Sequence, residues 1–299
     1  MSATASPESR PMTAPLTPAT LAGRSKGPRT WLLRTHSILV YVFLFFPILF
    51  LVAFSFNDSK AARWTGFTTR WYPDAFGSPV IRSAMSNTFL IAVIATLISV
   101  ALGTLAAYAL SRYRILGRAA YDGLFFIPLV IPEIVQAVSL LAFVSGTLPI
   151  VGGQIGRGLP AVIFGHVAFS ISFALVVVRA RLANFDERLE EASADLGANA
   201  WTTFWRVTFP LTLPGIVAGG LLAFTLSFDD LAITSFVTSP DRQTLPLFVY
   251  SNLKNGLDPK VNVVAVFMIG VSLLILALAL VFARLTARGG RTELPITVG

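Results

Sequence analysis

Six long apolar stretches constrain the fold of this chain more than any other feature of its sequence. Polar segments separate them, and none of the six contains a lysine or an arginine. A bilayer core of about 30 Å needs roughly 20 apolar residues per helix, which is the length of these stretches. Their approximate limits are Ser37–Phe56, Asn87–Leu110, Gly123–Val144, Leu159–Val178, Leu213–Leu231 and Val263–Ala283.

These stretches predict an all-α membrane protein with six transmembrane helices. The apolar runs are continuous rather than alternating, which disfavours a β-barrel. A helix satisfies its own backbone hydrogen bonds in lipid, so a helical bundle is expected. Only 13% of the residues are charged and the mean hydropathy is +0.73, which excludes a water-soluble globule.

The distribution of basic residues predicts the orientation. Of the 23 Lys and Arg residues, 15 fall in the two tails and in the second and fourth loops, and eight fall in the remaining loops. The positive-inside rule therefore places both termini on the cytoplasmic side. The net charge of +8 is attributed to these loops and not to nucleic-acid binding.

The two ends of the chain differ in composition from the middle. Residues 1–30 are rich in Pro, Ser, Thr and Ala, which predicts a disordered cytoplasmic tail. A transit peptide is the alternative, but Glu8 and the prolines argue against an amphipathic helix. The expected organisation is this tail, a membrane domain over residues 31–285, and a cytoplasmic C-terminal tail over residues 286–299.

The fourth loop, residues 181–212, is unusually long and polar. Asn184 or Asp186 can cap a first helix in it, and Gly197 suits the left-handed position that ends such a helix. A second short helix is predicted from a cap at Asn199 to about Val207, with Pro210 stopping it. The first helix carries one apolar stripe, formed by Phe185, Leu189, Ala192 and Leu196.

The first helix of this loop is also strongly acidic. A helix lying on the lipid surface is disfavoured, because such helices are normally basic and the inner leaflet is anionic. An ordinary solvated helix is a second alternative. The third is a docking element whose apolar stripe enters a groove of another protein while its carboxylates meet basic groups.

A spaced motif in this loop resembles the signature of ABC-importer permeases. Glu191-Ala192-Ser193 is followed by Gly197 and, after nine residues, by Val207 and Phe209-Pro210. The family pattern is E-A-A, three residues, G, nine residues, I-x-L-P. This chain departs from it at Ser193, Val207 and Phe209, where small or apolar residues replace like ones.

The resemblance implies a type I ABC importer permease bundle whose loop forms cytoplasmic coupling helices. It implies four partners: an ABC ATPase subunit dimer, a second permease subunit identical or different, an extracytoplasmic solute-binding protein, and the lipid bilayer of the bacterial inner membrane. The binding protein is expected to dock on loops 57–86 and 232–262. The implied ATPase-docking residues are Glu190, Glu191, Ala192, Ser193, Asp195, Leu196, Gly197 and Pro210.

Residues from about Gly165 to Leu280 resemble the second permease of spermidine/putrescine importers, which implies a polyamine cargo; an ABC permease for a different small solute is the alternative. The resemblance to the permease family covers about residues 35–285. The stretches that support it are Ile131–Val135, Ala168–Phe173, Leu226–Asp230, Ser235–Pro240 and Leu245–Leu247.

Three carboxylates lie inside the apolar stretches and are candidates for the translocation pathway. Glu133 lies in the third stretch, and Asp229 and Asp230 lie near the outer end of the fifth. A carboxylate facing lipid is costly, and ammonium groups would suit a carboxylate-lined path. The alternative is that these acids cap a helix break or pair with a basic group. His166, alone in the fourth stretch, is expected to be a packing residue.

No catalytic or cofactor motif occurs in the chain. It has no cysteine, two histidines and no phosphate-binding loop with a Gly-Lys pair, so no metal, no cofactor and no catalytic residue is expected. We therefore expect ATP hydrolysis on a partner chain. A secondary transporter driven by an ion gradient and a membrane-embedded enzyme are the other classes considered.

Overall fold

The computed structural model describes residues 28–59, 63–145, 157–183, 185–240, 242–253 and 258–289. The chain divides into two units, Met1–Phe50 and Leu51–Gly299, which are described separately. Most of the two predicted disordered tails lies outside the described residues.

The first unit contains most of helix α1 (Pro28–Phe54), which includes nearly all of the first predicted span. Its residues Trp31–Phe54 have a mean hydropathy of 2.7. Five described helices are long and apolar enough to cross a membrane, or six if a bent pair counts as one span.

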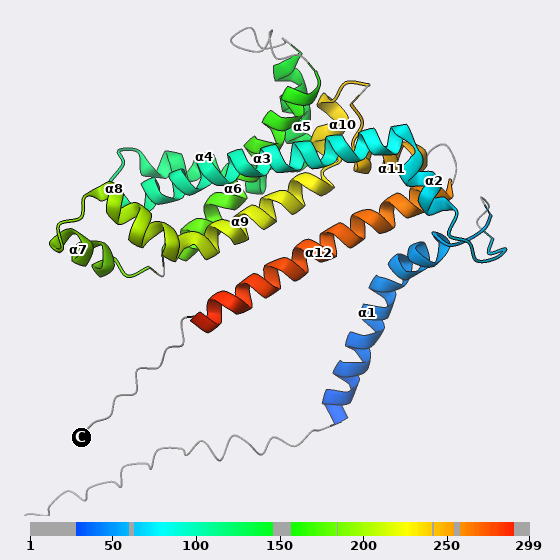
Figure 1. Cartoon of the computed structure of the whole chain (residues 1–299), viewed down its shortest axis with the longest axis horizontal. Coiled ribbons are helices and arrows are strands. Elements are labelled where there is room, and N and C mark those ends of the chain that lie inside the picture. Colours follow the sequence, from blue (N-terminus) through cyan, green and yellow to red (C-terminus); the bar gives the residue numbers. More distant parts are fainter. Residues whose placement is uncertain are drawn as a thin grey trace, which may run out of the picture. The chain divides into compact units, whose positions relative to one another are not determined.

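The second unit is helical, and its described residues form no strand beyond one isolated bridge between Asn57 and Phe67. Long helices run along the bundle, with α7 and α8 at one end and α2 and α11 toward the other, while α10 lies beside α5 (Figure 1). The elements are α2 (Trp71–Gly77), α3 (Pro79–Arg112), α4 (Arg118–Val130), α5 (Glu133–Val144), α6 (Leu159–Leu182), α7 (Arg188–Asp195), α8 (Ala200–Thr203), the π-helical turn η3 (Phe204–Thr208), α9 (Phe209–Asp229), α10 (Ala232–Val237), α11 (Leu245–Leu253) and α12 (Pro259–Gly289).

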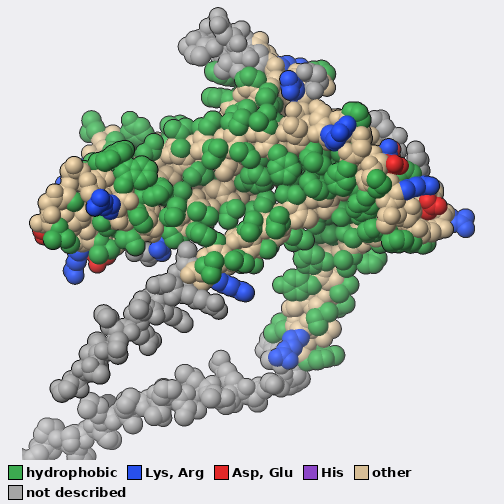
Figure 2. Space-filling model, viewed as in Figure 1, with side chains coloured by type: hydrophobic (Ala, Val, Ile, Leu, Met, Phe, Trp, Pro, Cys, Tyr) green, Lys and Arg blue, Asp and Glu red, His purple; other side chains and the backbone are tan. Residues whose placement is uncertain are grey.

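Helices α3, α6 and α9 pack against one another to form the centre of the bundle. Small residues at the contacts let the backbones approach closely, as is typical of membrane helices. A Cβ added at Gly103 of α3 would lie 3.0 Å from both the Ala174 Cβ and the Leu175 nitrogen of α6. A Cβ at Gly219 of α9 would lie 3.3 Å from the Ala174 oxygen. The visible face between the two ends is largely hydrophobic (Figure 2).

The third apolar stretch, Gly123–Val144, is not one straight helix. It consists of α4 and α5, which are bent by 109° at a short break. Ile131 precedes Pro132 and is extended (φ −70°, ψ 130°), because proline disfavours helical geometry in the residue before it. Pro132 also has no N–H with which to continue the helical hydrogen bonds.

Gln136 replaces the backbone hydrogen bonds that the break removes. In a continuous helix the N–H of residue 132 would donate to the Pro128 carbonyl, and Pro132 cannot do so. The Gln136 Nε2 donates instead to the Pro128 oxygen at 3.0 Å and to the Ile131 oxygen at 2.9 Å. A side chain thus satisfies carbonyls that lipid could not.

Gln136→Leu should therefore destabilise the purified protein by about 1–2 kcal/mol, because it leaves two carbonyls without their donor. Thermal unfolding in detergent measures this. Ser139→Ala is the matched control, since the Ser139 hydroxyl bonds only the Val135 carbonyl of its own helix. Equal melting temperatures for the two variants would contradict the bridging role of Gln136.

Pro210 does not end the second short helix of the fourth loop, contrary to the prediction. Residues Ala200–Asp229 form one apolar helical span that contains η3. In this turn the Phe209 N–H bonds the Phe204 carbonyl five residues back, which inserts one extra residue just before Pro210. The proline, which lacks a donor, then lies in the first turn of α9, where no donor is needed. The fifth span consequently begins earlier than the predicted Leu213.

Candidate functional site

Residues 183–208, here called the α7 loop, connect α6 to α9 and contain the motif at positions 191–210. The end of α7 is built as predicted: Gly197 has a φ of 85°, its N–H bonds the Ala194 carbonyl, and the Ala198 N–H bonds the Ser193 carbonyl. This hydrogen-bond pair is the Schellman arrangement that satisfies the last carbonyls of a helix. The start of α8 is capped as predicted, since the Asn199 side chain accepts from the Thr202 N–H at 2.9 Å.

The predicted docking residues of the α7 loop divide into two groups. Two of them point back into the protein: Glu190 accepts a hydrogen bond from Thr208, and the Ser193 hydroxyl lies 3.0 Å from the Thr203 hydroxyl. The others are exposed. They are Glu191, Ala192, Asp195, Leu196, Gly197 and Pro210.

Arg112, in the last turn of α3, fastens the α7 loop to the bundle. Its side chain is 11% exposed and lies 2.5 Å from a Glu187 oxygen and 3.3 Å from a Glu190 oxygen. Its guanidinium also lies over the Phe185 ring, 4.9 Å from the ring centroid. The same Glu190 oxygen accepts from the Thr208 hydroxyl at 2.6 Å. Glu190 therefore joins α3, α7 and η3, and holds α7 in a defined position.

The α7 loop also has an exposed surface that is both apolar and acidic. Leu196 is 89% exposed and Trp201 is 71% exposed, which is unusual for side chains of this size. Glu191 and Asp195 are exposed beside them in sequence and have no ion-pair partner among the described residues. This combination fits a partner with an apolar groove edged by basic groups.

The three candidate carboxylates line one cavity of about 580 Å³. Asp229 is exposed, Glu133 is half-buried and Asp230 is buried. Glu133 and Asp230 both line this cavity. The rest of the cavity wall comes from α6, α9, α10 and α11, including Phe169, Thr225, Phe236 and Tyr250. The break between α4 and α5 thus brings Glu133 to the end of α9.

Asp230 is occupied by contacts within the protein. Its two oxygens accept hydrogen bonds from the backbone N–H groups of Ile233 and Thr234 and from the Thr234 hydroxyl, at 3.2, 2.9 and 2.8 Å. It therefore caps α10, where the helix dipole favours a negative charge. The His166 Nε2 lies 2.9 Å from Asp230. Asp230 therefore has both structural roles that were considered for the aspartates, since it caps a helix and pairs with a basic group.

His166 connects α6 to the end of α9 and to α10. It is 2% exposed, and its Nδ1 lies 2.7 Å from the Ser227 hydroxyl while its Nε2 lies 3.0 Å from the Thr234 hydroxyl. These contacts are those of a hydrogen-bonded packing residue. Among the described residues, no group of three or more His, Asp or Glu is arranged to hold a metal ion.

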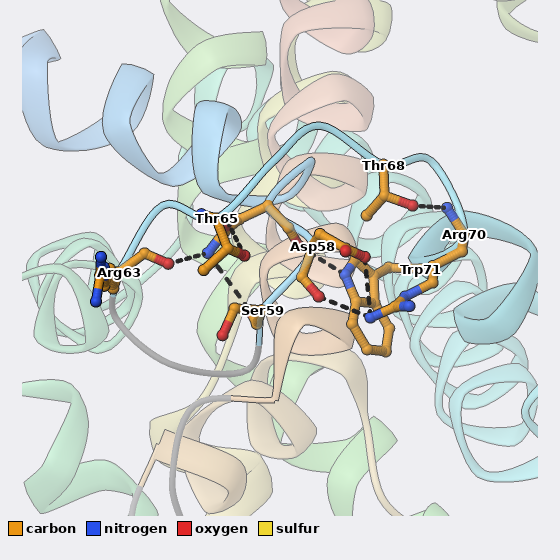
Figure 3. Close-up of polar contacts among 8 residues, drawn as sticks. Asp58, Ser59, Arg63, Thr65, Thr68, Arg70 and Trp71 are labelled. Atoms are coloured by element: carbon orange, nitrogen blue, oxygen red, sulfur yellow. Dashed lines mark hydrogen bonds and ion pairs between the residues drawn. The ribbon is translucent and has the colours of Figure 1, made fainter.

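At the opposite end of the bundle, the described residues between α1 and α2 are joined by polar contacts (Figure 3). Asn57 organises these contacts: its Nδ2 donates to the Arg63 carbonyl at 2.8 Å, and its Oδ1 accepts from the Thr65 N–H at 2.9 Å. Arg70 pairs with Asp58 at 3.0 Å and lies over the Trp71 ring. These contacts give this surface a defined shape.

Two residues that organise the site were not predicted from the sequence. Arg112 was counted only as a basic residue of a loop, although a basic residue facing an acid-rich loop is a signal for such a pair. Gln136 was not singled out, although an amide side chain one turn after a proline can satisfy the carbonyls that the proline leaves free. Arg112 contacts residues that are distant in the sequence. Gln136 contacts carbonyls on the other side of a bend between two helices.

The spanning helices, the exposed α7 loop and the acidic cavity together define a multi-pass membrane protein of the transport class. Residues 99–289 match the family described as binding-protein-dependent transport system inner membrane component. The chain belongs to this family, and it is a permease of the inner membrane.

Sequence relatives support the assignment over most of the chain. The spermidine/putrescine transport system permease protein PotC of Escherichia coli (strain K12) is 36% identical over 84% of this chain and 93% of its own length. The putrescine transport system permease protein PotI of the same strain is 37% identical over 78% and 84%. PotC of Haemophilus influenzae is 38% identical over 86% and 98%.

Solved structures share the fold. A bacterial ABC transporter that imports the acidic polysaccharide alginate has a chain with a TM-score of 0.68 at 17% identity, covering 87% of this chain and 96% of that one. The methionine ABC transporter MetNI has one with a TM-score of 0.52 at 24% identity, covering 68% and 92%. The predicted all-α fold of a type I ABC importer permease is confirmed.

Proposed function

We propose that this chain forms one half of the membrane pore of an ABC importer that takes up putrescine or spermidine. The observation that carries the proposal is the 36–38% identity to permeases named for these two solutes, over most of both chains. The exposed α7 loop and the acidic cavity are the two parts of the structure that such an importer needs. A second permease subunit, identical or different, forms the other half.

In this proposal the α7 loop lies in the cytoplasm and is bound by a separate ATPase subunit. The positive-inside count supports that orientation, with both termini on the same side. Leu196 and Trp201 enter an apolar groove of the ATPase, and Glu191 and Asp195 meet basic groups at its edge. Closure of an ATPase pair on ATP then moves α7, and Glu190 and Arg112 transmit the motion to α3 and η3.

The opposite end receives the solute from an extracytoplasmic binding protein. The described residues around Asn57 and the loops near α10 and α11 offer the docking surface. A solute released there meets the cavity that contains Glu133 and Asp229. Ammonium groups are attracted to these carboxylates, and a transient site must bind them weakly enough for release. Asp230 supports this wall by holding α10 in place.

Asp229→Asn should lower polyamine uptake several-fold without affecting assembly, because it removes the exposed charge of the cavity while keeping the side-chain shape. Uptake of radiolabelled putrescine by whole cells measures this. Wild-type uptake in Asp229→Asn would remove that residue from the pathway.

Reconstitution tests the function itself. We consider proteoliposomes that contain this chain, its second permease subunit and the ATPase. They should accumulate putrescine or spermidine only when ATP is inside the vesicles and the solute-loaded binding protein is outside. Accumulation of another solute, with none of either polyamine, would assign a different cargo. Uptake driven by an ion gradient without ATP would contradict the proposal.

A further inference from the structure

A groove between α9 and α12 adjoins the acidic cavity at Thr225 and Asp229, but the rest of its lining belongs neither to that cavity nor to the α7 loop. Its main part has a volume of about 760 Å³, within the range of about 300–1,000 Å³ typical of small-molecule sites. A smaller part of about 330 Å³ continues it toward the α7 end. The two parts adjoin each other, since Ala218, Leu221 and Ala279 line both.

The two ends of this groove carry opposite charges. Asp229 lines the end near the acidic cavity, and Arg181 lines the end near the α7 loop. Between them the walls are apolar, with Met268, Ile275 and Leu276 of α12 among the lining residues. A negative group matches the Arg181 end, and an apolar body matches the walls that lead away from it.

Arg181 lines the groove and, unlike Arg112 and Arg179, has no ion-pair partner among the described residues. Arg112 pairs with Glu187 and Glu190, and Arg179 pairs with Asp122 at 2.6 Å. Among the ion pairs of the described residues, none includes Arg181. Its side chain is exposed, so the terminal guanidinium nitrogens remain available to an anion.

The stem of Arg181 is held in place on α9. Its Nε donates to the Leu211 carbonyl at 3.2 Å, a contact that leaves the terminal nitrogens free to bind. A Cβ added at Gly215 would lie 2.6 Å from the Arg181 Cβ and 2.9 Å from its Cγ, so glycine makes the room that this stem occupies. The guanidinium is therefore positioned at the groove and is not a freely moving surface charge.

We propose that this groove binds an anionic phospholipid, with the phosphate at Arg181 and an acyl chain between α9 and α12. Basic pockets between membrane helices suit anionic head groups, and the guanidinium fork suits phosphate oxygens. Phosphatidylglycerol and cardiolipin have the required chemistry. The proposal rests on insertion of the chain in a membrane and is independent of which solute it transports. The bound lipid stabilises the first turn of α9, where the α7 loop joins the span.

Native mass spectrometry of the assembled importer, released from nanodiscs, tests this proposal. Wild-type protein should retain phosphatidylglycerol in preference to phosphatidylcholine. Arg181→Gln should lower the retained phosphatidylglycerol about fivefold, as expected from about 1 kcal/mol per basic residue near an anionic surface. Arg206→Gln is the matched control, because it removes an exposed charge of the same loop region that does not line the groove.

Two further variants keep the test decisive if Arg181→Gln does not assemble. Arg181→Lys should retain an intermediate amount, and Ala279→Phe, which fills the apolar part of the groove, should lower retention of both lipids. Equal retention of the two lipids by the wild-type protein would overturn the proposal. Displacement of the lipid by inorganic phosphate alone, or loss of the lipid when the second permease assembles, would also overturn it.

Discussion

Replacing Glu191 by lysine is expected to abolish binding of the ATPase subunit and to reduce polyamine uptake at least about tenfold. Glu191 is exposed on α7 and has no ion-pair partner among the described residues, so its charge is available to another protein. A lysine there would face basic groups, and placing like charges together at an interface costs several kcal/mol. Co-purification of the ATPase with the tagged permease measures the binding.

The matched control for Glu191→Lys is Asp74→Lys. Asp74 is an exposed acidic residue of the short helix α2, at the opposite end of the bundle. It undergoes the same charge change and should leave the ATPase bound. The amount of each variant in the membrane fraction shows whether it is inserted. Normal ATPase binding by inserted Glu191→Lys would contradict the docking role.

Replacing Gly103 by leucine is expected to prevent the bundle from folding. A Cβ at this position already lies 3.0 Å from the Leu175 nitrogen and 3.1 Å from the Ile171 oxygen, both in the backbone of α6. Backbone atoms cannot rotate away as a side chain can. The leucine carbons beyond the Cβ would therefore force α3 and α6 apart. The cost is about 3 kcal/mol, the upper end of the typical range for overpacking, and it falls on the central helix pair of the bundle.

Gly270→Leu is the matched control for this change. Gly270 lies in the spanning helix α12, and a Cβ added there meets nothing within 4 Å. The variant should accumulate in the membrane and elute from a sizing column as the wild type does. Gly103→Leu should instead be degraded or aggregated. Similar folded yields for the two variants would show that the α3–α6 contact is not as close as described.

The elements predicted best from the sequence were those fixed by local chemistry. Apolar length identified the spans, Asn199 identified the start of α8, and Gly197 identified the end of α7. Each depends on residues within one helix or one turn, so nothing distant is needed to recognise it. The spacing of the α7-loop motif likewise indicated the family without any knowledge of packing.

Where the structure differs from the prediction, the difference depends on how a helix accommodates a proline. Pro132 and Pro210 look alike in the sequence, since each follows an apolar or aromatic residue inside a helical stretch. At Pro132 the helix breaks and bends, while at Pro210 an extra residue in η3 lets the helix continue. Which of these happens depends on neighbouring segments, such as the Glu190 contact with Thr208, and these segments are distant in the sequence.

In the candidate site, too, some features follow from the local sequence and others depend on contacts with distant segments. The exposure of Glu191 follows from its place outside the apolar stripe of a short amphipathic helix, but the inward direction of Glu190 depends on Arg112 of another helix. Similarly, the sequence placed Asp229 and Asp230 side by side with equal roles. The structure separates them, because only Asp230 reaches the first turn of α10 and His166.

The central claim is that the α7 loop is a cytoplasmic surface covered by an ATPase, and labelling of one cysteine tests it most directly. The chain has no cysteine, so Leu196→Cys reports on this loop alone, with Asp74→Cys as the reporter for the opposite end. A membrane-impermeant maleimide should label Leu196→Cys in inverted vesicles but not in intact spheroplasts, and added ATPase subunit should protect it. Labelling of Leu196→Cys in spheroplasts, or unchanged labelling with the ATPase bound, would contradict the account.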